Sequence, residues 1–437
     1  MNQQIKQRIE QINNGQVPEG YKKTEFGIFP SDWVTDKKLK DIGSFDKGRG
    51  LPGDKMCDSG VPCVGYGDIY MKYNNFHFEK AENFVDEETA SESLPIKKGT
   101  LLFTGTGETA EEIGKCVCYN GDETIYAGGD IITFKTNEVN PLFLAYQQYQ
   151  SYSLAKKASF GQGHSVVHIH ADNLEKLNVA YPKPTAEQEK IAEILMKWDK
   201  AIELYNQQIE KLTLLKSSCI KKMFPQKGEK MPEWRFKGFS NAWEQRKLGE
   251  VASSFEYGLN AAAKEFDGVN KYLRITDIDD SSRVFKDDDL TSPDTDLSTA
   301  GGYQLHDGEI LFARTGASVG KSFIYRESDG LVYYAGFLIR AKVKPEYDSE
   351  FIFQNTLGAS YEKYIQITSQ RSGQPGVNAQ EYAEYTFLVP DYTEQKKIGG
   401  FLRQIDNLIT LHQRKVEIII KQRKALQQYL LNGIVRV

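Results

Sequence analysis

The architecture of this chain is readable from residues 185–223, TAEQEKIAEILMKWDKAIELYNQQIEKLTLLKSSCIKKM. Apolar residues recur there at spacings that alternate between four and three, which is the heptad pattern of a coiled coil. A second run with the same spacing follows Pro390 and extends to Leu430. Each run of roughly 35 residues predicts a helix about 50–55 Å long. The expected seam positions are Ile191, Leu195, Trp198, Ile202, Ile209, Leu212, Ile398, Leu402, Ile405, Ile409, Val416 and Ile419.

The two seams have two possible partners. Each could pack on its own globular domain, or the two helices could pack on each other. Two equal stripes in one chain favour the second arrangement, and a two-fold relation would make the helices antiparallel. Lys216 and Arg423 interrupt the seams at equivalent positions. They either fix the register at a cost in stability or lie near a frayed end, where their stems cover apolar surface.

The chain is an internal duplication. Phe29–Trp33 is echoed by Phe239–Trp243, and Gly99–Phe103 by Gly308–Phe312, at an offset of roughly 210 residues. Each copy begins with short apolar runs separated by glycines and ends in a long helix. The expected strands are 100–103, 124–134, 309–312 and 331–343, and the expected short helices are 142–152 and 351–364. We therefore predict two α+β domains, 1–182 (with a short N-terminal helical segment) and 227–390, and two long coiled-coil helices, 183–226 and 391–437.

Composition bounds the function. The 437 residues are 40% hydrophobic and 26% charged, which is typical of a soluble globular protein. No stretch approaches the roughly 18 apolar residues of a membrane span, and Met1–Gly15 lacks a signal-peptide core, so a cytoplasmic protein without a membrane partner is expected. Five cysteines without framework spacing favour a reducing compartment. A net charge of -5 gives no overall nucleic-acid signature, so DNA binding would require local patches.

Three motifs suggest chemistry but are incomplete. Phe103–Gly107 and Asn140–Phe143 resemble the cofactor loop and catalytic motif of DNA adenine methyltransferases, but the second proline of the latter is missing. Gly316–Ser322 is one residue short of a phosphate-binding P-loop. A turn that carries Lys321 towards a DNA phosphate, or a plain β-turn, fits it better.

Histidines gather at His164, His168 and His170, but too few ligands accompany them for a zinc site. We expect no metal and no catalytic residue in this chain.

The chain resembles the specificity (S) subunits of type I restriction-modification systems. The resemblance rests on residues 20–33, the helix starts at Glu187–Ile191 and Glu394–Ile398, and the tail Leu430–Val437. It implies that each α+β domain is a target-recognition domain that reads half of a bipartite double-stranded DNA site. It also implies that an antiparallel coiled coil sets the spacer and docks two modification (methyltransferase) subunits, through which restriction (translocase-nuclease) subunits join. S-adenosylmethionine would bind the modification subunit, ATP and Mg the restriction subunit, and no cofactor this chain.

Candidate DNA contacts lie in loops after the expected strands and in two small-polar loops. The candidates are Lys47, Arg49, Gln162, His164, Asn260, Arg274, Thr276, Arg314, Lys321, Arg371 and Gln374. Of these, Arg371 could contact guanine and Gln374 adenine in the major groove. An ordinary polar loop is the alternative at each position. For the whole chain, the alternatives are a catalytic DNA adenine methyltransferase and a coiled-coil scaffold without a nucleic-acid role.

Overall fold

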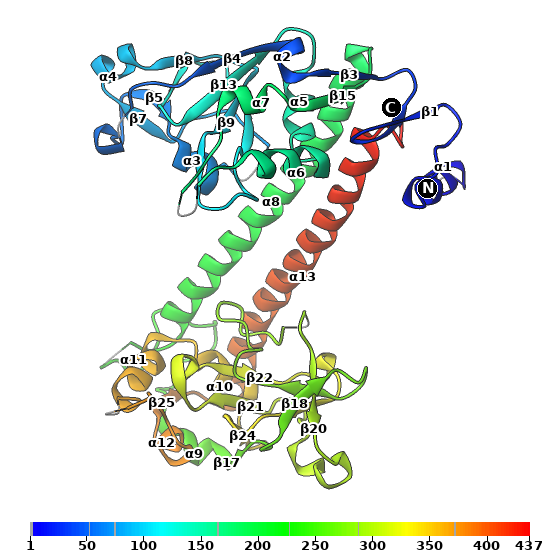
Figure 1. The fold of residues 1–437 in the computed structure, drawn as a ribbon. Helices are drawn as coiled ribbons and strands as arrows, with labels where there is room; N and C mark the ends of the chain where they lie inside the picture. The colour runs from blue at the N-terminus through cyan, green and yellow to red at the C-terminus, as the bar shows by residue number, and fades with distance from the viewer. Residues whose placement is uncertain are drawn as a thin grey trace. The chain divides into compact units, whose positions relative to one another are not determined.

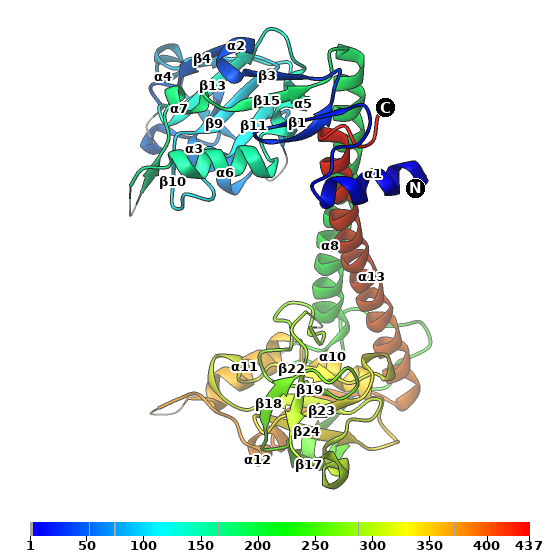
Figure 2. The ribbon, with the colours of Figure 1, turned by 45° about the vertical axis from the view of Figure 1, so that its right-hand side comes forward.

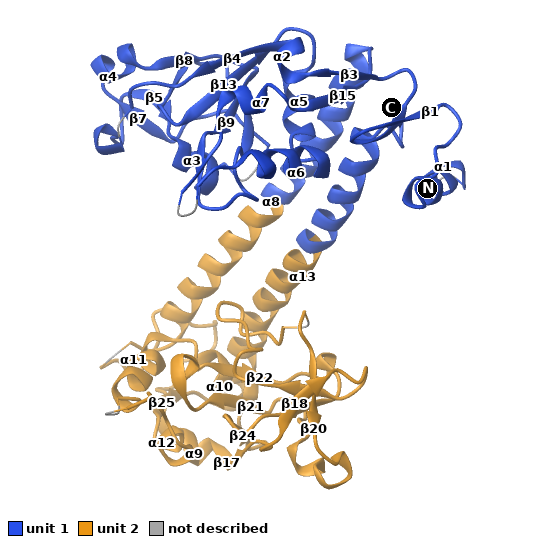
Figure 3. Cartoon of the chain, viewed as in Figure 1, with its two compact units in different colours: residues 1–204, 416–437 blue, residues 205–415 orange. Residues whose placement is uncertain are grey.

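The computed structural model describes residues 3–51, 53–73, 76–163, 166–226, 228–286, 288–370 and 373–437. It divides into two compact units, shown in Figure 3: unit 1 holds residues 1–204 and 416–437, and unit 2 holds residues 205–415. Each unit therefore contains one α+β domain together with a part of each long helix. The helices described here do not combine the length and apolarity needed to cross a membrane.

Unit 1 is built from short strands and helices around an antiparallel centre (Figure 1). Its strands are β1 (Tyr21–Thr24), β2 (Gly27–Pro30), β3 (Val34–Lys38), β4 (Gly43–Lys47), β5 (Val61–Val64), β6 (His77–Phe78), β7 (Asn83–Val85), β8 (Leu94–Ile96), β9 (Thr100–Thr104), β10 (Thr106–Gly107), β11 (Cys116–Tyr119), β12 (Ile125–Ala127), β13 (Ile131–Thr136), β14 (Val167–His168) and β15 (Asn178–Tyr181). Its helices are α1 (Gln3–Asn13), α2 (Leu39–Ile42), α3 (Tyr66–Met71), α4 (Glu87–Glu92), α5 (Pro141–Gln147), α6 (Ser151–Phe160) and α7 (Ala171–Leu174).

The main sheet of unit 1 has the strand order β4-β13-β9-β11-β6, and a smaller sheet has the order β7-β5-β12-β8. Every residue of the central strand β9 is buried. Phe103 and Phe134 of the main sheet pack with Phe143 of α5 in the principal core. The same core takes in Leu430 and Leu431, so the end of the chain completes the domain that begins it.

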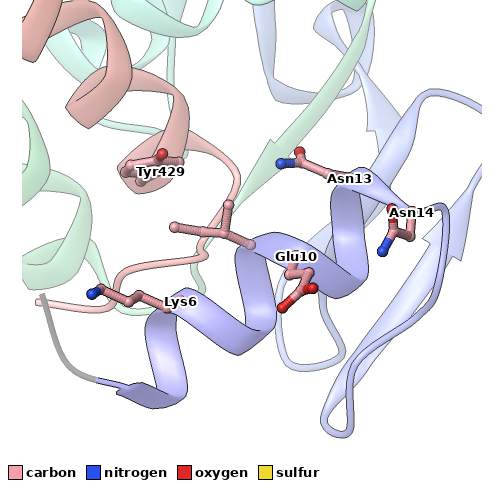
Figure 4. Close-up of a pocket in the computed structure, with 6 residues that line it drawn as sticks. Lys6, Glu10, Asn13, Asn14 and Tyr429 are labelled. Atoms are coloured by element: carbon pink, nitrogen blue, oxygen red, sulfur yellow. The ribbon is translucent and has the colours of Figure 1, made fainter.

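The end of the chain is also tied to the start by polar contacts. Arg8 of α1 donates to the Ile434 carbonyl (2.5 Å), and the Tyr21 hydroxyl donates to the Gly433 carbonyl (2.6 Å). Figure 4 shows Lys6, Glu10 and Asn13 of α1 beside Tyr429, around a pocket of about 460 Å³. The first helix therefore rests on the last one.

Unit 2 repeats this plan. Its strands are β16 (Glu244–Lys247), β17 (Ala252–Tyr257), β18 (Ala262–Glu265), β19 (Lys271–Leu273), β20 (Thr291–Asp294), β21 (Ile310–Ala313), β22 (Ser322–Ile324), β23 (Val332–Tyr334), β24 (Leu338–Val343) and β25 (Thr386–Val389). Its helices are α9 (Leu248–Val251), α10 (Ser349–Asn355), α11 (Ala359–Thr368) and α12 (Ala379–Ala383), with short 3-10 turns at Leu297–Thr299, Gly301–Tyr303, Gly316–Ser318 and Glu327–Asp329.

The strand order β17-β24-β21-β22 repeats β4-β13-β9-β11, and the pair β16–β25 repeats β3–β15. The echoed tryptophans, Trp33 and Trp243, are both buried. The predicted α+β class and the duplication are confirmed by this shared topology.

Some predicted elements are divided in the structure. The apolar run 124–134 forms β12 and β13, and 331–343 forms β23 and β24. The cause is that one run serves two sheets: β12 pairs with β5 and β8, whereas β13 pairs with β4 and β9. The predicted helices 142–152 and 351–364 are likewise each two helices, of which the first is almost wholly buried and the second is half exposed.

The long helices are α8 (Thr185–Met223) and α13 (Tyr392–Leu431), and both are labelled in Figure 2. All the predicted seam residues are buried or half-buried. In unit 2 the Tyr205 ring lies 5.4 Å from the His412 ring, and Lys216 pairs with Asp406 at 2.6 Å. Residue numbers rise along α8 as they fall along α13, so the two helices run antiparallel within that unit.

Both expected packing modes occur. Ile191 and Leu195 of α8 enter the core of unit 1 with Leu430 of α13, and Ile398 and Leu402 enter the core of unit 2. The seam therefore holds the helices to each other and to the α+β domain of the same unit. Lys216 and Arg423 are ion-paired within the helix pair and are not frayed ends.

Candidate nucleic-acid interface

Strand ends of unit 2 converge on a cavity of about 580 Å³. Strands β19 and β23 run parallel, and Leu259, just after β17, bridges to Ala335, just after β23. The loops that follow these strands and β21 therefore meet at one place. The predicted contact residues Asn260, Arg274, Thr276 and Arg314 all line this cavity. The structure thus brings together four residues that lie up to 54 positions apart in the sequence.

Arg314 lies between two aromatic rings. Its guanidinium carbon is 5.2 Å from the centre of the Tyr257 ring and 5.9 Å from that of Phe337. Its backbone N–H donates to the Phe337 carbonyl (3.0 Å), and its carbonyl accepts from the Val377 N–H (2.9 Å). Its Nε is buried without a hydrogen-bond partner. Backbone and rings therefore fix this cation in place.

Arg274 is held differently, by a carboxylate. Its Nε donates to Asp277 Oδ2 (2.8 Å) and its Nη2 to Asp277 Oδ1 (2.8 Å). These hydrogen bonds raise the pKa of Arg274 above its ordinary value. Thr276 donates to the same carboxylate (3.0 Å). Asp277 therefore neutralises and orients Arg274, and Arg314 is the arginine at the cavity that has no carboxylate partner among the described residues.

Gln374 lies at the edge of the same region. The Gly316 N–H donates to the Pro375 carbonyl (3.0 Å), which holds the loop of Gln374 against the turn after Arg314. Gln374 is exposed. Arg371, predicted in the same loop, lies outside the described residues, as does His164 of copy one.

Unit 1 presents different residues at the corresponding strand ends. Lys47 and Arg49 are exposed at and just after the end of β4. Gln162 is exposed in a loop whose backbone bonds to His168 in both directions (3.1 and 2.8 Å). Glycines Gly65 and Gly105 occupy the positions that correspond to Arg274 and Arg314. The two copies therefore share a scaffold and differ in the chemistry of their strand ends.

The expected phosphate contact of Lys321 is not supported. Its side chain is only 7% exposed, donates to the Ile278 carbonyl (3.1 Å) and pairs with Asp280 (2.5 Å). The ammonium is thus satisfied internally. Ser322 bonds to the Thr356 hydroxyl (2.7 Å), so the P-loop-like turn is part of the domain's packing.

The methyltransferase-like motif also has a structural explanation. The Asn140 side chain accepts from the Phe143 N–H (3.0 Å) and caps α5. Asp348 caps α10 in the same way, through the Phe351 N–H (2.8 Å). In each copy the cap's own N–H donates to a long-helix glutamine, Gln188 or Gln395. Because an aspartate replaces the asparagine in copy two, the shared role is helix capping.

The sequence alone missed Phe337. It is 56% exposed and follows β23 after Ala335 and Gly336. A large exposed aromatic residue beside a Gly-containing turn is the signal that could have identified it. Within the described ranges no group of three His, Cys, Asp or Glu side chains is placed to hold a metal ion.

The chain was compared with known proteins. The family model for the type I restriction modification DNA specificity domain matches twice, over residues 30–214 and 241–421. A type I restriction enzyme MjaVIII specificity subunit of Methanocaldococcus jannaschii is 27% identical over 375 residues, covering 82% of this chain and 83% of the relative. A putative MjaX specificity subunit of the same organism is 27% identical over 447 residues, covering 96% and 97%.

A solved structure shares the fold. The S subunit of a type I restriction-modification system from M. genitalium superposes with a TM-score of 0.65 at 15% identity, covering 91% of this chain and 96% of that one. Together, the two family matches cover most of the chain, one in each α+β copy. The role that the family description gives is DNA specificity in type I restriction modification. The chain belongs to the type I restriction-modification DNA specificity family.

Proposed function

We propose that each α+β domain reads one half of a bipartite duplex DNA site, and that the paired helices α8 and α13 set the unspecified spacer between the halves. The main support is the duplication itself: the same strand order occurs twice, with different polar residues at the strand ends. Two copies of one scaffold suit a ligand with two related halves. The difference between their strand ends suits two halves of different sequence.

The long helices suit the role of a spacer. Their seams are buried, and within each unit an ion pair joins α8 to α13. A charged pair at a single seam position allows one register and disfavours its neighbours. A register fixed in this way would give a spacer of one length.

The same helices carry surface that suits partner subunits. Large apolar side chains are exposed along them, which is typical of protein interfaces. They are Leu204, Ile418 and Ile420 in unit 1, and Leu214, Leu215, Leu408 and Leu411 in unit 2. We propose that two modification subunits dock here and that restriction subunits join through them.

S-adenosylmethionine would then bind the modification subunits, ATP and Mg the restriction subunits, and this chain would hold no cofactor. A complex acting on chromosomal DNA would work in the cytoplasm.

The net charge of -5 fits a division of labour in which the modification subunits supply much of the grip on phosphates. The isolated chain would then bind DNA weakly, with a shallow dependence on salt. Tight binding by the chain alone, with a steep salt slope, would contradict this part of the proposal.

The deciding experiment is to sequence the methylated bases of host DNA with the gene intact and with it deleted. Loss of one bipartite methyladenine motif on deletion is the expected result, and it would identify both half-sites. A strain whose motif list is unchanged while the protein is expressed with its modification subunit would contradict the proposal. Replacing residues 228–390 with a different recognition domain should alter only one half of the motif.

A further inference from the structure

Arg314 differs from three other arginines in the α+β domain of unit 2, each of which pairs with a carboxylate. Arg326 pairs with Glu350 (2.5 Å), Arg340 with Glu309 (3.3 Å), and Arg274 with Asp277 (2.8 Å). Arg314 has no ion pair or side-chain hydrogen bond with any residue that the structure describes. A half-buried cation without a counter-charge is costly. Such a group is consistent with a ligand that supplies the missing acceptors.

The surroundings of Arg314 orient its hydrogen-bond donors. The Tyr257 and Phe337 rings restrict the guanidinium, and its Nε is enclosed. The terminal amino groups are therefore the donors left for a ligand in the cavity. A planar fork held before binding loses little conformational freedom when it binds.

The chemistry of that fork selects among base edges. In the major groove guanine offers two acceptors, O6 and N7, which match two parallel N–H donors. Adenine replaces one acceptor with a donor, cytosine presents a donor, and thymine presents one acceptor beside a methyl group. Phosphate also accepts a fork. However, the two aromatic residues beside Arg314, Tyr257 and Phe337, are 44% and 56% exposed, and exposed aromatic surface suits the flat, weakly hydrated edge of a base.

We propose that Arg314 reads a guanine in the half-site recognised by unit 2, with Tyr257 and Phe337 as the residues that position it. This inference rests on the proposed function, in which unit 2 reads one half-site. Copy one has Gly105 at the corresponding position. The contact therefore belongs to one half of the bipartite motif and has no counterpart in the other.

The test uses the full chain assembled with its modification subunits, and duplexes that carry the methylation motif found in the host. Each guanine of both half-sites is replaced in turn by 7-deazaguanine, which lacks the N7 acceptor. The wild-type complex should lose roughly 5- to 150-fold in affinity at the guanine read by Arg314. In the Arg314→Gln complex the same replacement should have no further effect, while the guanines of the other half-site keep their full effect and show that the variant is folded.

Two further variants separate a base contact from a phosphate contact. Arg314→Lys keeps the charge and loses the fork, so it should lower affinity for the guanine site without lowering affinity for unrelated duplexes. Lys363→Gln removes an exposed charge of the same unit away from the cavity and should preserve every base preference.

A phosphate contact would be identified if Arg314→Gln lost affinity equally for all DNA sequences and Arg314→Lys kept that affinity. This result would overturn the inference. An unchanged 7-deazaguanine profile in Arg314→Gln would overturn it as well. In both cases an intact bipartite motif would leave the proposed function standing, whereas absence of any motif would refute that function first.

Discussion

Asp199 of α8 and Arg423 of α13 form a buried ion pair, with Arg423 Nε 2.8 Å from Asp199 Oδ1. The Tyr146 hydroxyl of α5 donates to the other oxygen of the carboxylate (2.7 Å), and the Phe76 ring lies 4.2 Å from the guanidinium. One carboxylate thus joins both long helices to the α+β domain of unit 1. At the equivalent positions of the other copy, Asp406 pairs with Lys216 and accepts from Gln354 (2.7 Å).

Removing one partner of the Asp199–Arg423 pair should destabilise unit 1 strongly. Arg423→Met leaves a buried carboxylate without a counter-charge, which costs about 3–5 kcal/mol. Adding Asp199→Asn should recover much of that loss, because no charge then stays buried. Urea denaturation measures both. The exposed pair Lys197–Glu193 gives the control, since Lys197→Met should leave stability almost unchanged. If Arg423→Met and Lys197→Met lowered the free energy of unfolding equally, this account would be contradicted.

Arg436 should stabilise unit 1 although it lies one residue from the end of the chain. Its guanidinium bonds to Glu187 at the start of α8 (2.5 and 2.8 Å) and to Asp32 (3.0 Å). Arg436→Ala leaves the nearly buried Glu187 carboxylate unpaired, so a loss of about 1–3 kcal/mol is expected. Thermal unfolding measures it. Glu394 depends on Arg235 in the same way in unit 2, so Arg235→Ala should lower the stability of unit 2 instead.

Substitutions of Lys47 and Lys321 should have different effects in DNA-binding assays of the assembled complex. Lys47 is exposed at the end of β4, so Lys47→Gln should weaken binding to all sequences and reduce the salt slope by about one. Lys321→Met should leave the salt slope unchanged and lower the melting temperature of unit 2, because it breaks internal contacts. A reduced salt slope for Lys321→Met in a fully folded complex would restore the phosphate contact expected from the sequence.

Stability should depend on pH through Lys157. This lysine is buried beside Tyr149 and Cys116 and donates to the Gly114 carbonyl (2.8 Å). Burial lowers its pKa to about 8 from 10.5. The unfolded chain therefore binds the extra proton between about pH 8 and 10.5, and stability should rise with pH across that window.

Lys157→Met removes the buried ammonium and the pH dependence that it causes. At pH 7 the variant should be more stable by up to about 3 kcal/mol, and its advantage should shrink as pH rises through the window. The measurement is the difference in unfolding free energy between the two proteins at each pH, which cancels the other titrating groups. A difference that grows with pH would show that the sign is wrong.

Asn140→Ala should affect folding and not methyl transfer. The lost cap costs about 1 kcal/mol. The methylation pattern of host DNA should be unchanged at permissive temperature. Asp348→Ala, the corresponding cap of copy two, should behave in the same way. Abolished methylation by an Asn140→Ala protein that is folded and assembled would revive the enzymatic interpretation.

Periodicity predicted the long helices because burial of a stripe such as Ile191 and Leu195 depends only on spacing along one helix. The duplication was predictable because residues such as Trp33 and Trp243 occupy the same buried place twice. The partners of Arg423 were not predictable, because the contact with Asp199 joins residues 224 positions apart.

The site was predicted in part. Loops after strands carry polar groups whatever the exact register, so the sequence could place Asn260 and Arg314 in the loops that line the cavity, and their contact with DNA stays a prediction. The burial of Lys321 was not predictable, because it depends on the loop of Ile278 and Asp280, which nothing in its own turn encodes. Phe337 was missed because it joins the site through its contact with Arg314. That residue follows a different strand, and the contact cannot be read from the sequence around Phe337.

The order in which this chain is synthesised is not the order in which its domains can be completed. Unit 2 is one continuous segment, whereas unit 1 needs Leu430 and Leu431 in its core. Domains usually fold from the N-terminus as they leave the ribosome. Here the first domain to emerge has to wait, partly formed, until Leu430 and Leu431 have been made, while the second can already close. A ribosome that stalls or terminates early would therefore release a chain whose last-made domain is the better folded.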